Sequence, residues 1–397
     1  MKVNNNGILG AAIAGILLTP AAMAADSITE ALNTGTAYGD FRLRYESVEQ
    51  DNTLRDASAL TLRSRLGYTT GSISGLSATI ELEDSRVVGG QDEYGGEFSA
   101  IADPETTELD QFFIQYKTDT TTSKIGRQVI NLDGQRFVGS VGWRQDRQTF
   151  DAFTINSKPT EKLSLYYAYI GQRNRILAET ADLTSDDHLL NVSYQTSLGK
   201  LVGYGYFLDV DDGIDNARDT LGVSFSGAKK LDSVKLLYSA EYAQQSFEDD
   251  DGSGVTDRDA TYTLLEVGLQ ASYFTGKLGY EVLGSDDGSY GFTTELATLH
   301  KFNGWADQFL GTPAVGLVDT YFSAGFKLPV GKLSVVYHDF SADEGSLDLG
   351  TEVDVVYGLK FAKQYNAGIK YAAYSAGDAD AGKVDADKLW LWVGASF

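Results

Sequence analysis

The sequence contains no cysteine, which excludes disulfide bonds and metal sites built on thiolates. Beyond residue 24 it has no apolar run approaching the ~20 residues that a membrane-spanning helix requires. It also lacks the Pro-rich hinge or Gly/Ser tract that would mark a linker between domains. With 43 glycines against 5 prolines, the composition suits many strands joined by turns in one continuous architecture.

The first residues have the pattern of an export signal. One cation, Lys2, precedes an apolar run over residues 8–18, and a proline and the small-residue stretch 22–24 follow. This pattern predicts a secretory signal peptide, residues 1–24, that is cleaved after Ala24. We expect residues 25–397 to form the mature, exported protein, as a single barrel domain.

Apolar and polar residues alternate along most of the mature sequence. In "DFRLRYES", Phe41, Leu43 and Tyr45 share one face of a strand, because successive side chains of a strand point to opposite sides. The pattern recurs in "LTLRSRLGY" at 60–68 and in "VDVVYGLKF" at 353–361. Soluble antiparallel sandwiches alternate in the same way, so the connections between the segments must separate the two architectures.

These connections alternate between short and long, as in bacterial outer-membrane barrels with short periplasmic turns and longer outer loops. Nine long and eight short connections predict about 18 strands, the even number that such barrels require. The region 289–297 looks like a further strand, but counting it would make the number odd, so we assign it to a long connection. The short connections lie near 70–75, 117–123, 157–161, 196–200, 227–232, 273–277, 327–332 and 361–365, and the long ones near 48–58, 86–107, 130–148, 172–186, 209–219, 245–260, 284–315, 341–351 and 376–386.

The two predicted ends of the barrel differ in charge. Lysines gather at the short connections, whereas the long ones carry acidic runs such as "QSFEDDDGSG". The closing segment "DKLWLWVGASF" ends in Phe397 and resembles the C-terminal signal of bacterial outer-membrane barrels. The sequence therefore predicts an all-β protein, a transmembrane antiparallel β-barrel of the cell outer membrane, whose acidic loops meet lipopolysaccharide through divalent cations.

Arginine is concentrated in the first half of the chain, where 12 of the 14 arginines precede residue 176. A barrel of ~18 strands encloses a lumen too wide for side chains to fill, and guanidinium groups lining it would favour anions. In the alternative interpretation, the arginines pair with luminal acids such as Asp40, Glu46, Glu81, Glu83 and Asp151 and hold a loop to the wall. The candidate pore-lining arginines are Arg42, Arg44, Arg63 and Arg65 on the polar face of the first two strands, and Arg127, Arg136, Arg144 and Arg147 at the third long connection.

The stretch "GRQVINLDGQRFVGSVGWRQDRQTFDA", residues 126–152, resembles a segment of the alginate-export family of outer-membrane barrels, in its Gly-Arg-Gln, Arg-Phe-Val-Gly and Trp-Arg-Gln elements. A second stretch, residues 296–322, is similar to another part of that family. The resemblance implies an 18-stranded channel whose electropositive lumen conducts an anionic polysaccharide. It also implies that Arg127, Arg136, Arg144 and Arg147 line the constriction with Asp133 and Asp151 as acidic counterparts, while Asp146 departs from an attractive path for anions.

The long connection 284–315 contains "FNGWADQFLG", in which we expect Phe302, Trp305 and Phe309 to pack together. This element folds into the lumen as a plug or gate in one interpretation, and anchors the connection on the barrel rim in the other.

The sequence predicts no catalytic residue, no metal site, no cofactor and no nucleic-acid partner. The three histidines, His188, His300 and His338, lack an accompanying nucleophile motif, and the aspartate runs lack the spacing of a calcium loop. We expect a channel, or porin, for passive passage of anionic or polar solutes. The alternatives are a plugged structural or adhesin-like barrel and a barrel hydrolase, and monomer and homo-oligomer both stay open.

Overall fold

The computed structural model describes residues 26–211, 216–250 and 255–397. The predicted signal peptide, residues 1–24, lies outside these residues. Eighteen strands form one sheet. They are β1 (Thr36–Gln50), β2 (Ala57–Thr69), β3 (Leu76–Glu93), β4 (Thr106–Lys117), β5 (Thr121–Gln128), β6 (Thr149–Ser157), β7 (Leu163–Asn174), β8 (Leu183–Gln195), β9 (Lys200–Leu208), β10 (Arg218–Leu231), β11 (Val234–Asp250), β12 (Val255–Gln270), β13 (Phe274–Leu283), β16 (Leu317–Lys327), β17 (Lys332–Ser341), β18 (Asp348–Phe361), β19 (Tyr365–Ser375) and β20 (Ala386–Ser396).

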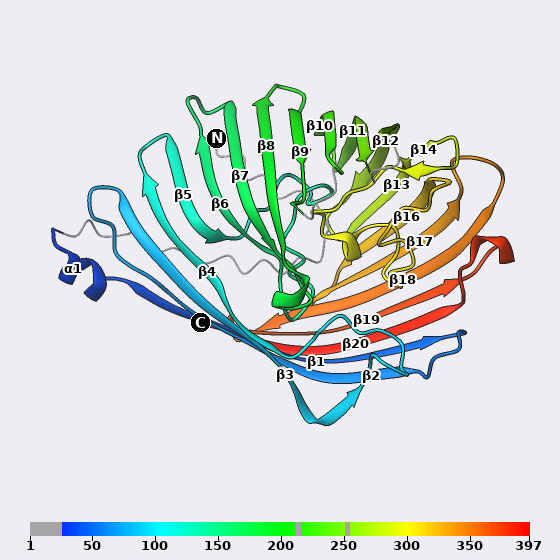
Figure 1. Ribbon diagram of the computed structural model, residues 1–397, viewed down its shortest axis with the longest axis horizontal. Helices are drawn as coiled ribbons and strands as arrows, with labels where there is room; N and C mark the ends of the chain where they lie inside the picture. Colours follow the sequence, from blue (N-terminus) through cyan, green and yellow to red (C-terminus); the bar gives the residue numbers. More distant parts are fainter. Residues whose placement is uncertain (1–25, 212–215, 251–254) are drawn as a thin grey trace.

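The sheet closes on itself, because β1 pairs with both β2 and the last strand, β20. At one position of β1, Asp40 faces Arg65 on one side and Ser396 on the other. Every neighbouring pair is antiparallel, and consecutive strands surround the loops of the interior in Figure 1. The predicted all-β, 18-stranded antiparallel barrel is therefore confirmed.

The helices are short, and η2 belongs to a loop that packs inside the barrel. They are α1 (Ile28–Asn33), which Ser27 caps, and the 3-10 turns η1 (Glu179–Ala181), η2 (Leu299–Lys301) and η3 (Ala379–Ala381). In the part of the chain that the structure describes, no helix is both long and apolar enough to cross a membrane.

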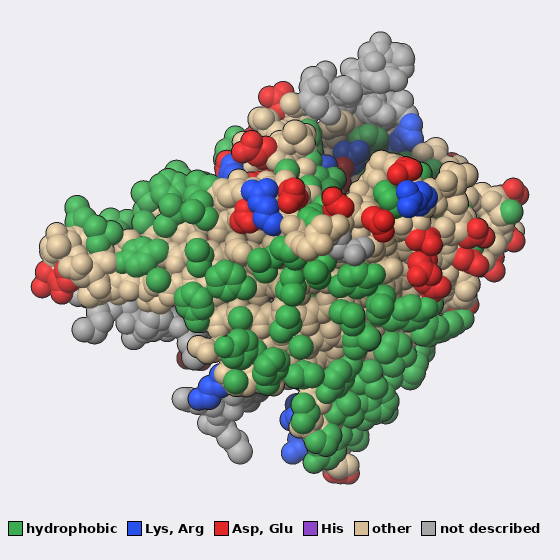
Figure 2. All heavy atoms as spheres, turned by 90° about the horizontal axis from the view of Figure 1, so that it is seen from below, with side chains coloured by type: hydrophobic (Ala, Val, Ile, Leu, Met, Phe, Trp, Pro, Cys, Tyr) green, Lys and Arg blue, Asp and Glu red, His purple; other side chains and the backbone are tan. Residues whose placement is uncertain are grey.

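The alternation of side chains sorts the strands into a lipid face and an inner face. In β20, Leu391 and Val393 are 42% and 44% exposed, whereas the alternate residues Trp390 and Trp392 are buried. Apolar side chains cover a broad area of the outer surface in Figure 2, as expected for a surface that meets hydrocarbon. Arg42, Arg44 and Glu46 of β1 lie on the other, inner face, as the sequence predicts.

The predicted connections are recovered, with shifts at some strand ends. The turn between β10 and β11 is 232–233 rather than 227–232, and β3 continues to Glu93 rather than ending near residue 86. Backbone pairing needs no apolar side chains, so strands extend through polar residues that the pattern assigned to connections. In the region 289–297, only Tyr290–Gly291 is extended. This segment is β15, which pairs with β14 (Ser285–Asp286) outside the barrel sheet, so its assignment to the connection is confirmed.

Three outer connections pack against inward-facing residues of the barrel: the second loop (94–105), the third loop (129–148) and the seventh loop (284–316). Val138 of the third loop and Phe292 and Leu296 of the seventh loop are at most 1% exposed. All four tryptophans of the sequence, Trp143, Trp305, Trp390 and Trp392, belong to or pack against this interior cluster. The loops thus supply the side chains that a barrel of this width cannot supply from its strands alone.

Candidate functional site

The third loop is fastened to the barrel wall by a guanidinium that binds its backbone. Arg42 points inward from β1, and its charge meets only neutral acceptors of the loop. Four of its N–H groups are directed at one short segment, so the path of the loop is set mainly by main-chain atoms. The acceptors are the carbonyl oxygens of Gly142 at 3.3 Å, Trp143 at 2.6 Å and Arg144 at 2.7 Å, and Gln145 Oε1 at 3.0 Å.

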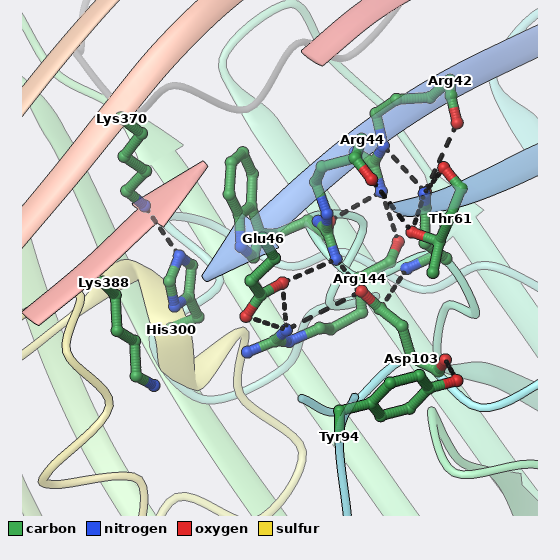
Figure 3. A network of polar contacts seen from close by, with 12 residues as sticks. Arg42, Arg44, Glu46, Thr61, Tyr94, Asp103, Arg144, His300, Lys370 and Lys388 are labelled. Atoms are coloured by element: carbon green, nitrogen blue, oxygen red, sulfur yellow. Dashed lines mark hydrogen bonds and ion pairs between the residues drawn. The ribbon is translucent and has the colours of Figure 1, made fainter. Parts of the chain in front are cut away.

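Next to Arg42, a buried network of charges joins three loops to β1 (Figure 3). Arg144 of the third loop lies 3.0 Å from Glu46 Oε1 of β1 and 3.1 Å from Asp307 Oδ2 of the seventh loop. Arg44 of β1 pairs with Asp103 of the second loop, which also accepts the Gln145 backbone N–H at 2.8 Å. The second loop is therefore part of the site, although no sequence signal pointed to it.

The electrostatics of this network favour the charged forms of its loop residues. Burial acts to raise the pKa of Asp103, but the guanidiniums of Arg44 and Arg144 hold that pKa below its ordinary value. Burial also acts to lower the pKa of Arg144, and the carboxylates of Glu46 and Asp103 more than offset it. Each charge is thus stabilised by its partners rather than by water.

The other predicted arginines also have carboxylate partners. Within the described residues, seven of the eight candidates pair with at least one acid, and Arg42 is the exception. Such pairing is what the loop-holding interpretation requires, and it leaves little positive charge free. Besides Arg44 and Arg144, the pairs are Arg63 with Asp40, Arg65 with Glu83, Arg127 with Asp151 at 2.7 Å, Arg136 with Glu281 at 2.7 Å, and Arg147 with Glu81 and with Asp110 at 2.5 Å.

Exposure separates these arginines into two groups. The side chains of Arg127 and Arg147 are 22% and 16% exposed. Those of Arg44, Arg63, Arg65, Arg136 and Arg144 are at most 8% exposed.

The two acids named by the resemblance have different surroundings. Asp151 pairs with Arg127, as expected. Asp133 does not meet an arginine: Lys200 Nζ lies 2.7 Å from its Oδ1, and Asn191 donates to its Oδ2 at 2.7 Å. This carboxylate sits on a turn of the third loop with a φ of 45°, where it contacts residues of β8 and β9. The expectation that Asp133 is a counterpart of the arginines is therefore wrong.

Asp146 lies between two arginines in sequence but pairs with neither. It is 3% exposed, and its Oδ2 accepts the backbone N–H of Ala178 at 3.2 Å. Burial raises the pKa of Asp146 to about 9, with a further contribution from Glu83 and Glu108. The carboxyl is thus neutral at pH 7, so it adds no negative charge to the path.

The third and seventh loops are joined to each other as well as to the wall. Val138 and Leu296 form a parallel β-bridge, and the Gly139 N–H donates to the Leu296 carbonyl oxygen at 2.7 Å. Arg136 adds a hydrogen bond of 3.0 Å to Asn303 Oδ1. The two loops therefore form one unit across the interior.

Three inner lysines were not selected from the sequence. Lys124 of β5 lies 4.3 Å from the Phe113 ring centre, and Lys301 of the seventh loop donates to a backbone carbonyl oxygen. Lys370 of β19 is 2.7 Å from His300 Nε2 and 3.8 Å from the ring centre of Trp305. Across the described residues, none of the three has an ion pair. Lys124 was interpreted as a rim lysine because it follows a short turn, and no signal distinguished the other two.

The histidines contact carboxylates, a lysine and a tyrosine. His300 Nδ1 lies 2.6 Å from Asp307, His338 Nδ1 lies 2.9 Å from Asp319, and His188 lies 2.9 Å from the Tyr167 hydroxyl. Burial lowers the pKa of His300 to about 3, which fits a neutral ring that accepts from Lys370. Within the described residues, no group of three or more His, Cys, Asp or Glu is arranged to hold a metal ion.

Comparisons with known proteins agree with this architecture. OccAB4 of Acinetobacter baumannii has a TM-score of 0.71 at 16% identity, over 91% of this chain and 98% of its own. Pseudomonas aeruginosa OpdK, crystallised with vanillate, has a TM-score of 0.68 at 16% identity over 92% and 99%. P. aeruginosa OccD3 (OpdP) has a TM-score of 0.70 at 14% identity over 93% and 92%. No curated protein matches the chain.

Residues 33–280 match a protein family described as alginate export. The matched range includes the arginine-rich stretch 126–152 and ends before the second stretch, 296–322, so it bears on the first alone. It spans more than half of the chain. The protein, a porin-like barrel of the outer membrane, therefore belongs to the alginate-export family.

Proposed function

We propose that the protein is a passive channel for anionic or polar solutes, with an anionic polysaccharide or oligosaccharide as the solute class that its family suggests. The observation that carries this proposal is Arg42, an inner guanidinium whose hydrogen bonds all go to neutral acceptors. Its positive charge is therefore not cancelled by a bound carboxylate. Lys124 and Lys301 repeat this arrangement elsewhere in the interior.

Passage needs no covalent chemistry. A cation without a carboxylate partner lowers the electrostatic barrier for an anion that leaves bulk water, and paired charges nearby change that barrier little. The partly exposed Arg127 and Arg147 offer further contacts, because their guanidiniums reach water while their carboxylates keep them in place. The predicted roles of the buried, paired arginines become structural in this proposal: Arg44, Arg63, Arg65, Arg136 and Arg144.

The test is the reversal potential of the refolded protein in a salt gradient across a planar bilayer. We expect an anion-selective wild type, and Lys124→Gln should shift selectivity toward cations. Within the described residues Lys124 forms no ion pair and lies over the Phe113 ring, so its replacement removes charge without breaking an ion pair. Lys162→Gln, on an exposed turn, is the matched control and should behave as wild type. A cation-selective wild type, or a Lys124→Gln variant that keeps its anion selectivity, contradicts the proposal.

A second candidate is a plugged barrel with a structural or adhesin-like role. It is favoured by the three infolded loops, whose contacts reach β1, β13, β18 and β20. The same bilayer recording separates the two, because a folded barrel without conductance supports the plug. We also propose that the acidic outer loops meet lipopolysaccharide through divalent cations.

A further inference from the structure

Pairs of lysines face each other across the short turns at the periplasmic end of the barrel. Lys327 of β16 is directly opposite Lys332 of β17, and Lys230 of β10 is directly opposite Lys235 of β11. All four side chains are exposed. Like charges directly opposite each other destabilise a strand pair, so two such pairs at the same end of the barrel need a compensating anion.

The pairs lie on the inner face of the wall. Phe326, next to Lys327, is 37% exposed on the lipid face, and strand side chains alternate, so Lys327 and Lys332 face the lumen. By the same alternation Leu231, 42% exposed on the outer face, places Lys230 inward. These ammonium groups therefore lie around the periplasmic mouth of the channel.

A third ammonium belongs to the pair on β16 and β17. Lys332 is opposite Gly358 of β18, and Lys360 lies two residues further along the same face. Diagonal neighbours of this kind are about 7–8 Å apart, within reach of long side chains. The turn that joins β16 to β17, residues 328–331, and the turn that follows β18, residues 362–364, contain no acidic residue. Within the described residues, none of the three lysines has an ion pair.

We propose that Lys327, Lys332 and Lys360 form a binding site for dianionic groups, such as a phosphoryl group or a dicarboxylate, at the periplasmic mouth. Opposite residues have Cβ atoms about 5 Å apart, so two ammonium groups can reach the oxygens of one phosphoryl group. A dianion neutralises the charges of two ammonium groups, whereas a monoanion neutralises only one of them. Lys230 and Lys235 repeat the arrangement. The site extends the proposed function, on which it rests, from the interior of the barrel to its periplasmic mouth.

The probe is inorganic phosphate, added to the refolded protein in a zwitterionic detergent and followed by the width of its 31P resonance. We expect wild type to broaden the signal strongly above the second pKa of phosphate and weakly below it. In the variant Lys327→Gln/Lys332→Gln/Lys360→Gln, the half-saturating concentration should rise about fivefold, the effect of losing exposed ion pairs. The matched control is Lys158→Gln/Lys229→Gln/Lys363→Gln, which removes the same number of exposed lysines in or beside short turns and should keep the wild-type value.

Equal losses in the two variants would reduce the site to general surface charge and overturn the proposal, as would equal binding of the monoanion and dianion. The measurement needs no conductance, so the two proposals fail separately. A barrel that binds phosphate but does not conduct contradicts only the proposed function. An anion-selective barrel that binds no phosphate contradicts only this site.

Discussion

Replacing Arg144 by glutamine should loosen the third loop at a large cost in stability. Its side chain is 6% exposed and bridges Glu46 and Asp307, which are themselves almost completely buried. Removing one partner of a buried ion pair costs about 3–5 kcal/mol, because the remaining charge is left without compensation. Glu46 keeps Arg44 at 3.2 Å and Asp307 keeps Lys388 at 2.9 Å, so we expect about 3 kcal/mol, the lower end of that range.

The same replacement at Arg127 provides the comparison. This arginine also belongs to the arginine-rich stretch and also has a carboxylate partner, but its side chain is 22% exposed and that of Asp151 is 38% exposed. Exposed pairs contribute at most about 1 kcal/mol. Arg127→Gln should therefore be at least about 2 kcal/mol less destabilising than Arg144→Gln.

Tryptophan fluorescence in a urea titration of the refolded barrel measures the difference. Trp143 stacks on His300 at 5.1 Å between ring centres and lies 5.8 Å from Trp390, so release of the third or seventh loop changes the emission. Each variant's unfolding midpoint, multiplied by the slope of its transition, gives the free energy to compare. Equal destabilisation by the two replacements would refute the assignment of Arg144 as a buried loop anchor.

Two further predictions concern the pH dependence of the loops. The pKa of Asp146 is raised from 3.8 to about 9, so the folded state holds a proton that the unfolded state loses; stability should fall as the pH rises from about 4 to about 9. Asp146→Asn should remove this dependence of the unfolding free energy on pH. If the dependence persists in the variant, groups other than Asp146 cause it. The pKa of His300 is lowered from 6.5 to about 3, so docking of the seventh loop should be strongest above about pH 6.5 and weaken as the pH falls toward 3. Tryptophan fluorescence reports this docking, and in His300→Gln it should change less as the pH falls. An unchanged pH dependence in the variant contradicts the role of His300.

The strands and their faces follow from the sequence because lipid and lumen impose a period of two. The exposed Leu391 and Val393 beside the buried Trp390 show that rule operating in one strand. The number of strands followed from the alternation of connection lengths, which reflects the two sides of the membrane. Strand ends were less well predicted, as in β3, because backbone pairing continues beyond the membrane, where apolar and polar side chains no longer alternate.

The partners of the site residues could not be found in the same way. Arg144 bridges positions 98 and 163 residues away in sequence, and no local period relates such positions. The stretch 126–152 marked where the arginines gather, but most of their carboxylate partners lie outside it, on β1, β3, β4 and β13 and on the seventh loop. Lys370 gave no signal at all, since a single lysine in a strand does not show that it faces a histidine and tryptophans.

The way Arg42 holds the third loop has a consequence for variation among relatives. Three of its four hydrogen bonds go to main-chain carbonyl oxygens, which every amino acid possesses. Those three bonds therefore survive a change of side chain at positions 142–144, although the Arg144 side chain holds the loop through ion pairs of its own. Placement of the loop and chemistry of the loop are in this respect separate properties. New solute preferences can therefore arise by substitution at Gly142, where there is room for a side chain, while Arg42 and the Arg144 side chain keep the segment in place.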